Sequence, residues 1–128
     1  MANTVQIGTN PIAWSNDDMR ELGGATPLDV CLSEAVEAGY QGIELGHKFP
    51  RDAAALTPIL KKHGIELISG WYSSELLSRS VDEEIIALEP HLSLLTAMGC
   101  NVVVWAETSG CVHGAKDCLL YTSPSPRD

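Results

Sequence analysis

Polar and aromatic side chains recur in this chain directly after short apolar runs, and together they suit the recognition of a polyol. Indole faces cover the apolar C–H faces of a sugar-like ring, while carboxylates and ammonium groups hydrogen-bond its hydroxyls. The candidate binding residues at the ends of the four runs are Thr9, Asn10, Trp14 and Asn16, then Glu44, His47 and Lys48, then Trp71 and Tyr72, and finally Trp105, Glu107 and Thr108.

Glu44 is the most informative member of the set. It stands between Ile43 and Leu45, so the alternation of a strand turns its side chain away from their apolar face. In a barrel strand that direction is inward, and a buried acid needs a partner. Glu44 and His47 have ExxH spacing, which on a helix would place two metal ligands on one face. Here the pair follows a strand, so it does not by itself predict a metal site.

Four more of these residues, Trp14, Lys48, Trp71 and Glu107, each have a structural interpretation as well. Trp14 and Trp71 fit a hydrophobic core as readily as a binding site, and Glu107 fits a structural role as readily as a functional one. Lys48 is readily explained as a surface lysine. No spacing indicates a Ser-His-Asp or Cys-His catalytic set, and no catalytic residue is assigned from the residues alone.

The elements that must position these side chains alternate in type. Apolar, strand-like runs cover residues 5–8, extended through 11–14, and then 42–45, 66–71 and 101–105. The last run is continuous and β-branched, which is typical of a strand buried on both faces. Helical patterns lie between the runs, and each is followed by a glycine that predicts its end: Gly39, Gly64 and Gly99.

The starts of the helices are also predicted. Thr26 is the expected cap of the first helix with Pro27 at its first position, Asp52 caps the second, and the box 80–83 opens the third. Pro58 and Pro90 fall inside the second and third patterns, where proline removes a hydrogen bond. We therefore expect a kink there, or a late start of the second helix with Thr57 as its cap.

The order β-α-β-α-β-α-β predicts a parallel sheet with right-handed crossovers. Two folds are consistent with this order of elements, an open doubly wound sheet and a (β/α)8 barrel. No GxGxxG follows the first run and no GxxxxGK[ST] occurs, so a nucleotide-binding fold has no motif support. A barrel typically needs about 250 residues, and four βα-type units fit the N-terminal half of a (β/α)8 TIM barrel. Its ligand would lie beyond the carboxyl ends of the strands.

Composition narrows the class of protein further. The chain has 128 residues, and 45% of them are hydrophobic. Its net charge of −9 argues against nucleic acid as a partner, because phosphate groups are bound by positive charge. It has no apolar run of about 20 residues and no N-terminal secretory pattern. We expect a cytoplasmic protein without a membrane partner. Cys31 and Cys100 are predicted to be reduced core residues.

The last eleven residues, 118–128, match at every position the translation of a transposase-type sequencing adapter. Such segments are set aside before the fold is considered. This match predicts that residues 1–117 are the N-terminal part of a barrel protein and that residues 118–128 are an adapter-derived tail.

Several of these strings together resemble one family. Residues 12–19 (Ile-Ala-Trp-Ser-Asn-Asp-Asp-Met), 21–24, 42–46, 48–52 and 97–99 resemble the inosose dehydratases, which belong to the xylose isomerase-like TIM barrel superfamily. The similarity covers roughly residues 5–109. The strings at 14–18 and 48–52 are fairly specific, whereas the glutamate at position 44 is shared across many sugar isomerases and epimerases.

The resemblance implies that the parent protein dehydrates 2-keto-myo-inositol, a small cyclic polyol ketone, in myo-inositol catabolism with a divalent metal, manganese or cobalt. Of the candidate residues named above, it implies a predicted substrate-binding set of five: Trp14, Glu44, Lys48, Trp71 and Glu107. It also implies metal ligands at later strands, outside this chain, so we expect the fragment alone to be inactive and to hold no metal. The oligomeric state is open. Alternatives are a sugar isomerase or epimerase of the same superfamily, and a small non-enzymatic α/β binding module.

Overall fold

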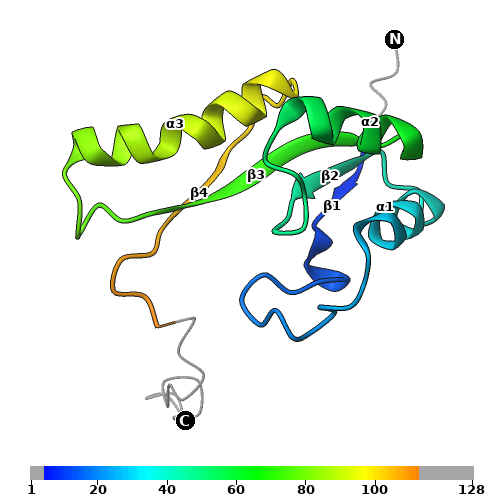
Figure 1. Ribbon diagram of the computed structural model, residues 1–128, viewed down its shortest axis with the longest axis horizontal. Coiled ribbons are helices and arrows are strands. Elements are labelled where there is room, and N and C mark those ends of the chain that lie inside the picture. Colours follow the sequence, from blue (N-terminus) through cyan, green and yellow to red (C-terminus); the bar gives the residue numbers. More distant parts are fainter. Residues whose placement is uncertain (1–4, 113–128) are drawn as a thin grey trace.

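Four parallel strands form one sheet in the order in which they occur along the chain (Figure 1). The computed structural model describes residues 5–112. Within them β1 is Gly8–Thr9, β2 is Gly42–Leu45, β3 is Glu66–Ser74 and β4 is Val104–Glu107. Each strand pairs in parallel with the next one. A doubly wound sheet reorders its strands, so the consecutive order confirms the predicted half of a (β/α)8 barrel.

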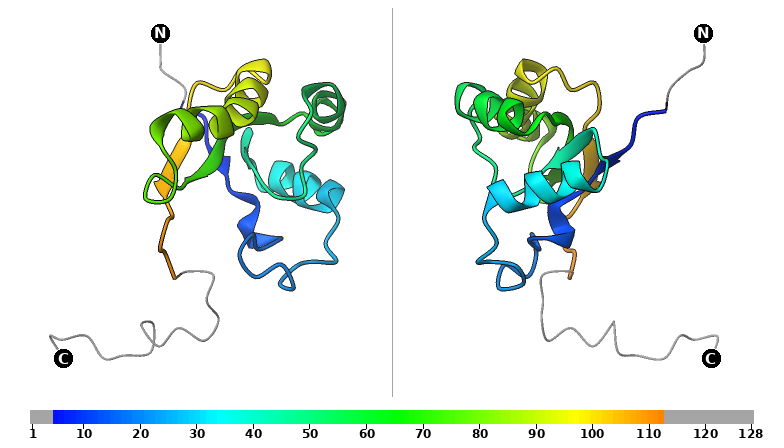
Figure 2. Two further views of the ribbon diagram at one scale, coloured as in Figure 1. Left: turned by 60° about the vertical axis from the view of Figure 1, so that its left-hand side comes forward. Right: turned by 90° about the vertical axis from the view of Figure 1, so that its right-hand side faces the viewer.

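The helices lie along one side of this sheet, which leaves its other side uncovered by described elements (Figure 2). They are α1, Leu28–Glu37; α2, Ala53–His63; and α3, Val81–Ala97. A short 3-10 helix, η1, covers Pro11–Ala13 directly after β1. This one-sided covering is what a barrel segment requires, because helices form its outer ring and strands its inner wall.

The core lies between the sheet and the helices, around side chains that are completely buried. Leu32 of α1, Ile43 of β2 and Leu56 of α2 each have 0% exposure. Burial of one such side chain stabilises the fold by about 1.5–3 kcal/mol. Cys31 is 3% exposed and Cys100 packs against the same cluster, so the two thiols are core residues as predicted. Burial raises the pKa of Cys31 to about 11.

The predicted helix ends are largely confirmed. The Asp52 carboxylate accepts from the Ala55 N–H at 2.8 Å and caps α2. Ser80 and Glu83 form the reciprocal capping box of α3. Gly64 ends α2 with a φ of 69°, in the left-handed region that suits glycine.

The predicted bounds of three strands are wrong. β1 covers Gly8–Thr9 rather than residues 5–8, and β4 covers Val104–Glu107 rather than residues 101–105. Residues 11–13 do not extend β1, because the Asn10 side chain accepts from the Ile12 N–H and Pro11 fixes the φ of a 3-10 turn. β3 runs three residues beyond Trp71, and β4 begins only at Val104. Val102 is 56% exposed, so the run at 101–105 is not buried on both faces in the described residues.

Two helix expectations are also corrected. The first helix begins at Leu28 with Pro27 as its N-cap, so Thr26 is not the cap. The second helix runs unbroken from Ala53 through Pro58, and Thr57 is not a cap. Its hydroxyl instead donates to the Ala53 carbonyl at 2.7 Å. The third helix likewise continues through Pro90.

No helix within residues 5–112 is both long enough and apolar enough to span a bilayer. The predicted tail, residues 118–128, and the predicted boundary at residue 117 lie outside the described residues.

Candidate functional site

A cavity of about 580 Å³ opens at the carboxyl ends of the strands, where a barrel binds its ligand. Residues from three segments line it: the turn and loop after β1, the sheet itself, and the turn after β4. The lining residues are Asn10, Ile12, Asp17, Asp18, Glu44, Trp71, Ser73, Ala106, Glu107, Thr108 and Cys111. Three of the five predicted site residues, Glu44, Trp71 and Glu107, are therefore brought together.

Glu44 is held in this cavity by one hydrogen bond to each carboxylate oxygen. The Asn10 side-chain amide donates to Oε1 at 2.8 Å, and the Ser69 hydroxyl donates to Oε2 at 3.1 Å. The inward direction predicted from strand alternation is confirmed, because Ile43 and Leu45 are buried on the helix side while Glu44 lines the cavity. Each carboxylate oxygen has two lone pairs, so Glu44 faces the cavity as a hydrogen-bond acceptor with capacity left for a ligand.

Trp71 supplies the apolar part of the wall. Its side chain is 50% exposed, and its indole N–H donates to the Ser73 hydroxyl at 2.9 Å. This bond satisfies the polar edge of the ring within its own strand. The ring face remains available for the C–H face of a cyclic ligand.

Glu107 ends β4 and organises the turns beside it. Its carboxylate accepts from the Ser74 hydroxyl at 2.7 Å, from the Leu76 N–H at 2.9 Å and from the Ser109 N–H at 2.8 Å. Hydrogen bonds from Ser109, and then from Leu76 and Ser74, lower the pKa of Glu107 to about 2. Both oxygens thus have protein partners, which gives Glu107 a structural role at the rim of the cavity.

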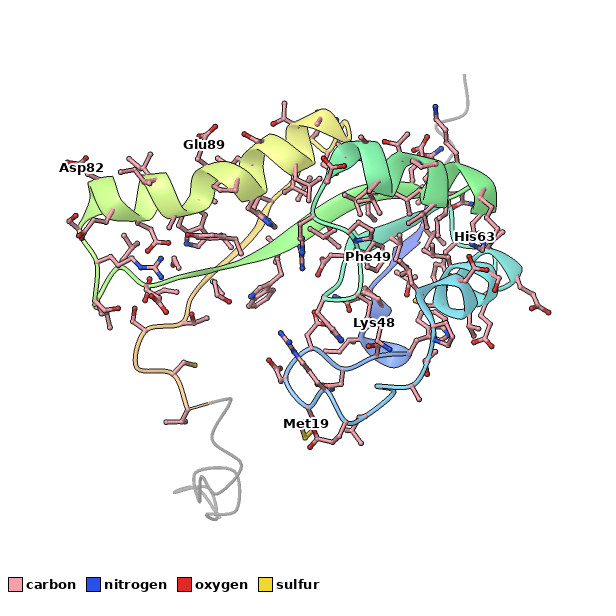
Figure 3. All side chains as sticks on the ribbon, in the orientation of Figure 1. Met19, Lys48, Phe49, His63, Asp82 and Glu89 are labelled. Atoms are coloured by element: carbon pink, nitrogen blue, oxygen red, sulfur yellow. The ribbon has the colours of Figure 1, made fainter. Side chains whose placement is uncertain are left out.

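The structure does not bring Trp14 and Lys48 to the cavity. The Trp14 indole N–H donates to the Glu34 carboxylate of α1 at 2.6 Å, and its ring packs against the core. The Lys48 ammonium donates to the carbonyls of Gly23, Gly24 and Thr26. Figure 3 shows Lys48 between the sheet and the loop that carries Met19. Both side chains hold the scaffold together and lie outside the proposed site.

His47 and Glu44 are separated despite their ExxH spacing. His47 Nδ1 lies 2.5 Å from an Asp17 carboxylate oxygen, and its Nε2 lies 3.4 Å from the Ser15 hydroxyl. Because a carboxylate only accepts, the Nδ1 proton points to Asp17. His47 therefore fixes the loop after β1, which carries Asp17 and Asp18 to the cavity wall.

The other histidines serve packing or surface contacts. His63 ends α2 and its Nε2 lies 2.8 Å from Asp29 of α1, so it joins two helices as well as meeting the helix end (Figure 3). His91 lies on α3 with its Nε2 buried and without a hydrogen-bond partner. His113 lies outside the described residues.

The charge of the cavity is entirely negative within the described chain. Four of its eleven lining residues are acidic and none is basic. Such a wall repels phosphate and carboxylate groups, because like charges in a partly enclosed site are poorly screened. It suits a neutral ligand that donates hydrogen bonds through its hydroxyls.

Across residues 5–112 no group of three or more His, Cys, Asp or Glu side chains is placed to hold a metal ion. The Glu44 oxygens already accept from Asn10 and Ser69. These residues therefore do not by themselves fit a divalent metal.

Sequence reasoning missed part of this site. Ser69 lies inside the predicted run 66–71, where nothing distinguished it from other strand residues, and Ser73 lies beyond the predicted end of that run. Asp17 and Asp18 lie in the loop that the structure folds back over the cavity. Asn10 was recognised at the end of a strand, but its bond to Glu44 spans 34 residues and is visible only in three dimensions.

The chain is similar over most of its length to curated proteins named MocC and inosose dehydratase. It is 53% identical over 106 residues to the rhizopine catabolism protein MocC of Rhizobium meliloti, covering 83% of this chain and 33% of MocC. It is 40% identical over 120 residues to the inosose dehydratase of Mesomycoplasma hyopneumoniae strain 7448, covering 94% of this chain and 40% of that protein. It is 38% identical over 119 residues to the inosose dehydratase of Geobacillus thermodenitrificans, covering 93% and 40%. The chain thus spans only about a third to two fifths of these relatives.

No family model matches the chain. Among solved structures it resembles the crystal structure of an AP endonuclease, family 2, from Brucella melitensis, with a TM-score of 0.55 and 19% identity. The similarity covers 78% of this chain and 40% of that chain, and at this identity it supports the TIM-barrel fold alone. The chain is thus homologous over most of its own length to proteins named inosose dehydratase and to MocC, and its fold is that of part of a TIM barrel.

Proposed function

We propose that the protein represented by this chain removes water from 2-keto-myo-inositol, and that residues 5–112 supply part of the wall that binds the ring. The observation that carries the proposal is a carboxylate, Glu44, held by Asn10 and Ser69 in a cavity that Trp71 also lines. The identity to proteins named inosose dehydratase supports the same substrate class.

The role proposed for these residues is binding and orientation. Trp71 would cover the C–H face of the ring, while Glu44 accepts hydrogen bonds from ring hydroxyls. Such contacts hold the ketone ring in one orientation, which is a large part of what a dehydratase needs. In the reaction a proton leaves the carbon beside the ketone and the hydroxyl on the next carbon departs as water. We assign neither the base nor the acid to a described residue.

A divalent metal, manganese or cobalt, is part of the proposal for the whole protein. When bound, such a metal would act as a Lewis acid toward oxygen atoms of the substrate. The described residues do not form a site for it, so we expect its ligands in the part of the relatives that this chain does not cover. The binding role of Glu44 and Trp71 does not depend on it.

A phosphorylated sugar is the least suitable of the alternative substrates, because the described wall carries four carboxylates and no basic side chain. An isomerase or epimerase acting on a neutral keto sugar would share the enediolate and differ only in whether a hydroxyl leaves. Identification of the product separates that activity from dehydration.

A chimeric enzyme tests the proposal directly. Residues of the Geobacillus thermodenitrificans inosose dehydratase that align with this chain, about two fifths of its length, are replaced by the corresponding residues of this chain. We expect water loss from 2-keto-myo-inositol, detected as product formation, and a large loss of kcat/KM with Glu44→Gln. Glu37→Gln, at the exposed end of α1, is the matched control.

A folded chimera that binds manganese or cobalt but leaves 2-keto-myo-inositol unchanged would contradict the proposal. Conversion of the substrate to an isomer, without loss of water, would favour the isomerase alternative.

A further inference from the structure

The Asn10 side chain uses both ends of its amide, and the two ends serve different parts of the fold. Its Oδ1 accepts from the Ile12 N–H at 2.8 Å, and its Nδ2 donates to Glu44 Oε1 at 2.8 Å. A backbone N–H can only donate, so the carbonyl end must face Ile12. The orientation of the amide is therefore fixed by the backbone, and the NH₂ group necessarily faces Glu44.

The second donor to Glu44 depends on an irregularity in the sheet. Ile43 pairs with Leu67 but Glu44 pairs with Ser69, so the register shifts by one residue between β2 and β3. The shift lets Ile68 pack against Gly8 and Gly42, where an added Cβ would lie 2.1 Å and 2.3 Å from its side chain. Ser69, the next residue, then still reaches Glu44 at 3.1 Å. Bulges of this kind re-aim side chains beside functional sites.

We propose that Asn10 is a positioning residue of the polyol site, which holds the Glu44 carboxylate in one orientation and ties it to the turn that begins the loop bearing Asp17 and Asp18. The geometry of these contacts does not depend on the substrate, but their purpose rests on the proposed function. One amide thereby links the β2 wall of the cavity to its loop wall. Glu44 is left with acceptor positions toward the cavity, so the ligand must supply the donors.

A variant that keeps the turn but removes the donor isolates this role. Asn10→Asp retains an oxygen that caps Ile12, since Asp and Asn are equally good caps. It places a second carboxylate against Glu44 in place of the NH₂ group. Asn16→Asp is the matched control, because Asn16 Oδ1 accepts from the N–H groups of Asp18 and Met19 in a similar turn. Each substitution is made in the chimeric enzyme described above, alone and combined with Glu44→Gln.

Thermal unfolding provides the measurement. At pH 7 we expect Asn10→Asp to lower Tm by about 5 °C or more relative to Asn16→Asp, as loss of a charge-assisted hydrogen bond and a repulsive pair require. In the Glu44→Gln background the same substitution should cost little, because the new amide donates to the new carboxylate. The deficit of Asn10→Asp should also shrink as the pH falls and carboxylates become protonated.

Equal Tm losses for Asn10→Asp in the two backgrounds, or a loss no greater than that of Asn16→Asp, would overturn the proposal. Failure of the proposed function has a different signature: the rescue by Glu44→Gln persists while the chimeric enzyme does not act on 2-keto-myo-inositol.

Discussion

At the scale of single residues, Glu44, Glu107 and Lys48 are each positioned by hydrogen bonds with neutral partners. Glu44 and Glu107 both line the cavity, but Glu44 accepts from two protein donors and Glu107 from three. Lys48 is held in the opposite way, by three carbonyl oxygens. Residue type alone therefore did not distinguish a ligand-binding group from a structural one.

Lys48→Met should loosen the loop between η1 and α1. The substitution retains much of the aliphatic stem but removes the charge-assisted bonds to the carbonyls of Gly23, Gly24 and Thr26. We expect a loss of about 2–3 kcal/mol in the free energy of unfolding, measured by urea denaturation. Lys61→Met, on the exposed surface of α2, is the control and should change it by less than about 0.5 kcal/mol. Equal losses would show that the three carbonyl contacts contribute no stability.

Glu107 makes stability depend on pH in a defined window. Its pKa falls from 4.5 to about 2 on folding, so its ionisation stabilises the folded state above the unfolded pKa. That contribution is lost as the pH falls through the folded pKa. We expect Glu107→Gln to lower Tm at pH 7 and this difference to shrink between about pH 5 and pH 2. A Tm difference that stays constant across that window would contradict the assignment.

At the scale of elements, close packing between β3 and α3 depends on a missing side chain. A Cβ on Gly70 would lie 2.9 Å from His91 Cε1 and 3.0 Å from Leu95 Cδ2. Glycine at this position lets α3 approach the sheet. The approach buries His91, and this burial lowers the pKa of its imidazole. The end of β3 is further fixed to α3 by the Tyr72 hydroxyl, which donates to the buried Glu84 carboxylate.

Gly70→Ala tests this packing. The methyl group must displace His91 and Leu95, and we expect a loss of about 1–3 kcal/mol in the free energy of unfolding. Glu66→Ala, at the exposed start of the same strand, is the control for a change of strand propensity. Recovery of the lost stability in the double variant with His91→Ala would confirm the contact. Unchanged stability with Gly70→Ala would show that α3 has room to move.

At the scale of the whole molecule, the described sheet has an open side and unpartnered apolar surface. Ile68 and Trp71 are 40% and 50% exposed on the strand wall, and Ile85 and Ile86 are 56% and 73% exposed on α3. Exposed apolar side chains of this kind favour contact with another surface or aggregation. In a complete barrel, neighbouring βα units cover both kinds of surface.

We therefore predict that the 128-residue chain alone self-associates and does not dehydrate 2-keto-myo-inositol, with or without manganese or cobalt. Light scattering coupled to size-exclusion chromatography measures the association, and product analysis measures the reaction. Ile85→Lys and Ile86→Lys should reduce the association, because each places a charge on the exposed face of α3. A monodisperse monomer that turns over the substrate would refute this prediction.

The part of the fold that could be predicted from sequence is the part set by local chemistry. The capping box at Ser80, the glycine that ends α2 and the alternation around Glu44 each act within a few residues, and the structure confirms all three. The prediction of strand boundaries was wrong where a side chain changed the local backbone. The Asn10 side chain, for example, caps a 3-10 helix that begins at Pro11, so the chain does not continue there as a strand. The predicted burial of residues 101–105 on both faces was wrong for a different reason, because burial depends on neighbours far along the chain.

By itself the sequence determined the order of elements, the fold class, the family resemblance and the acid that points into the cavity, because periodicity, caps and short motifs are local properties. Only the tertiary structure decided which polar residues meet. It placed Asn10 and Ser69 on Glu44 across 34 and 25 residues of chain, and it placed Lys48 and Trp14 outside the cavity that Glu44 lines. Contacts over such distances arise from strand register and loop closure, which no local pattern encodes.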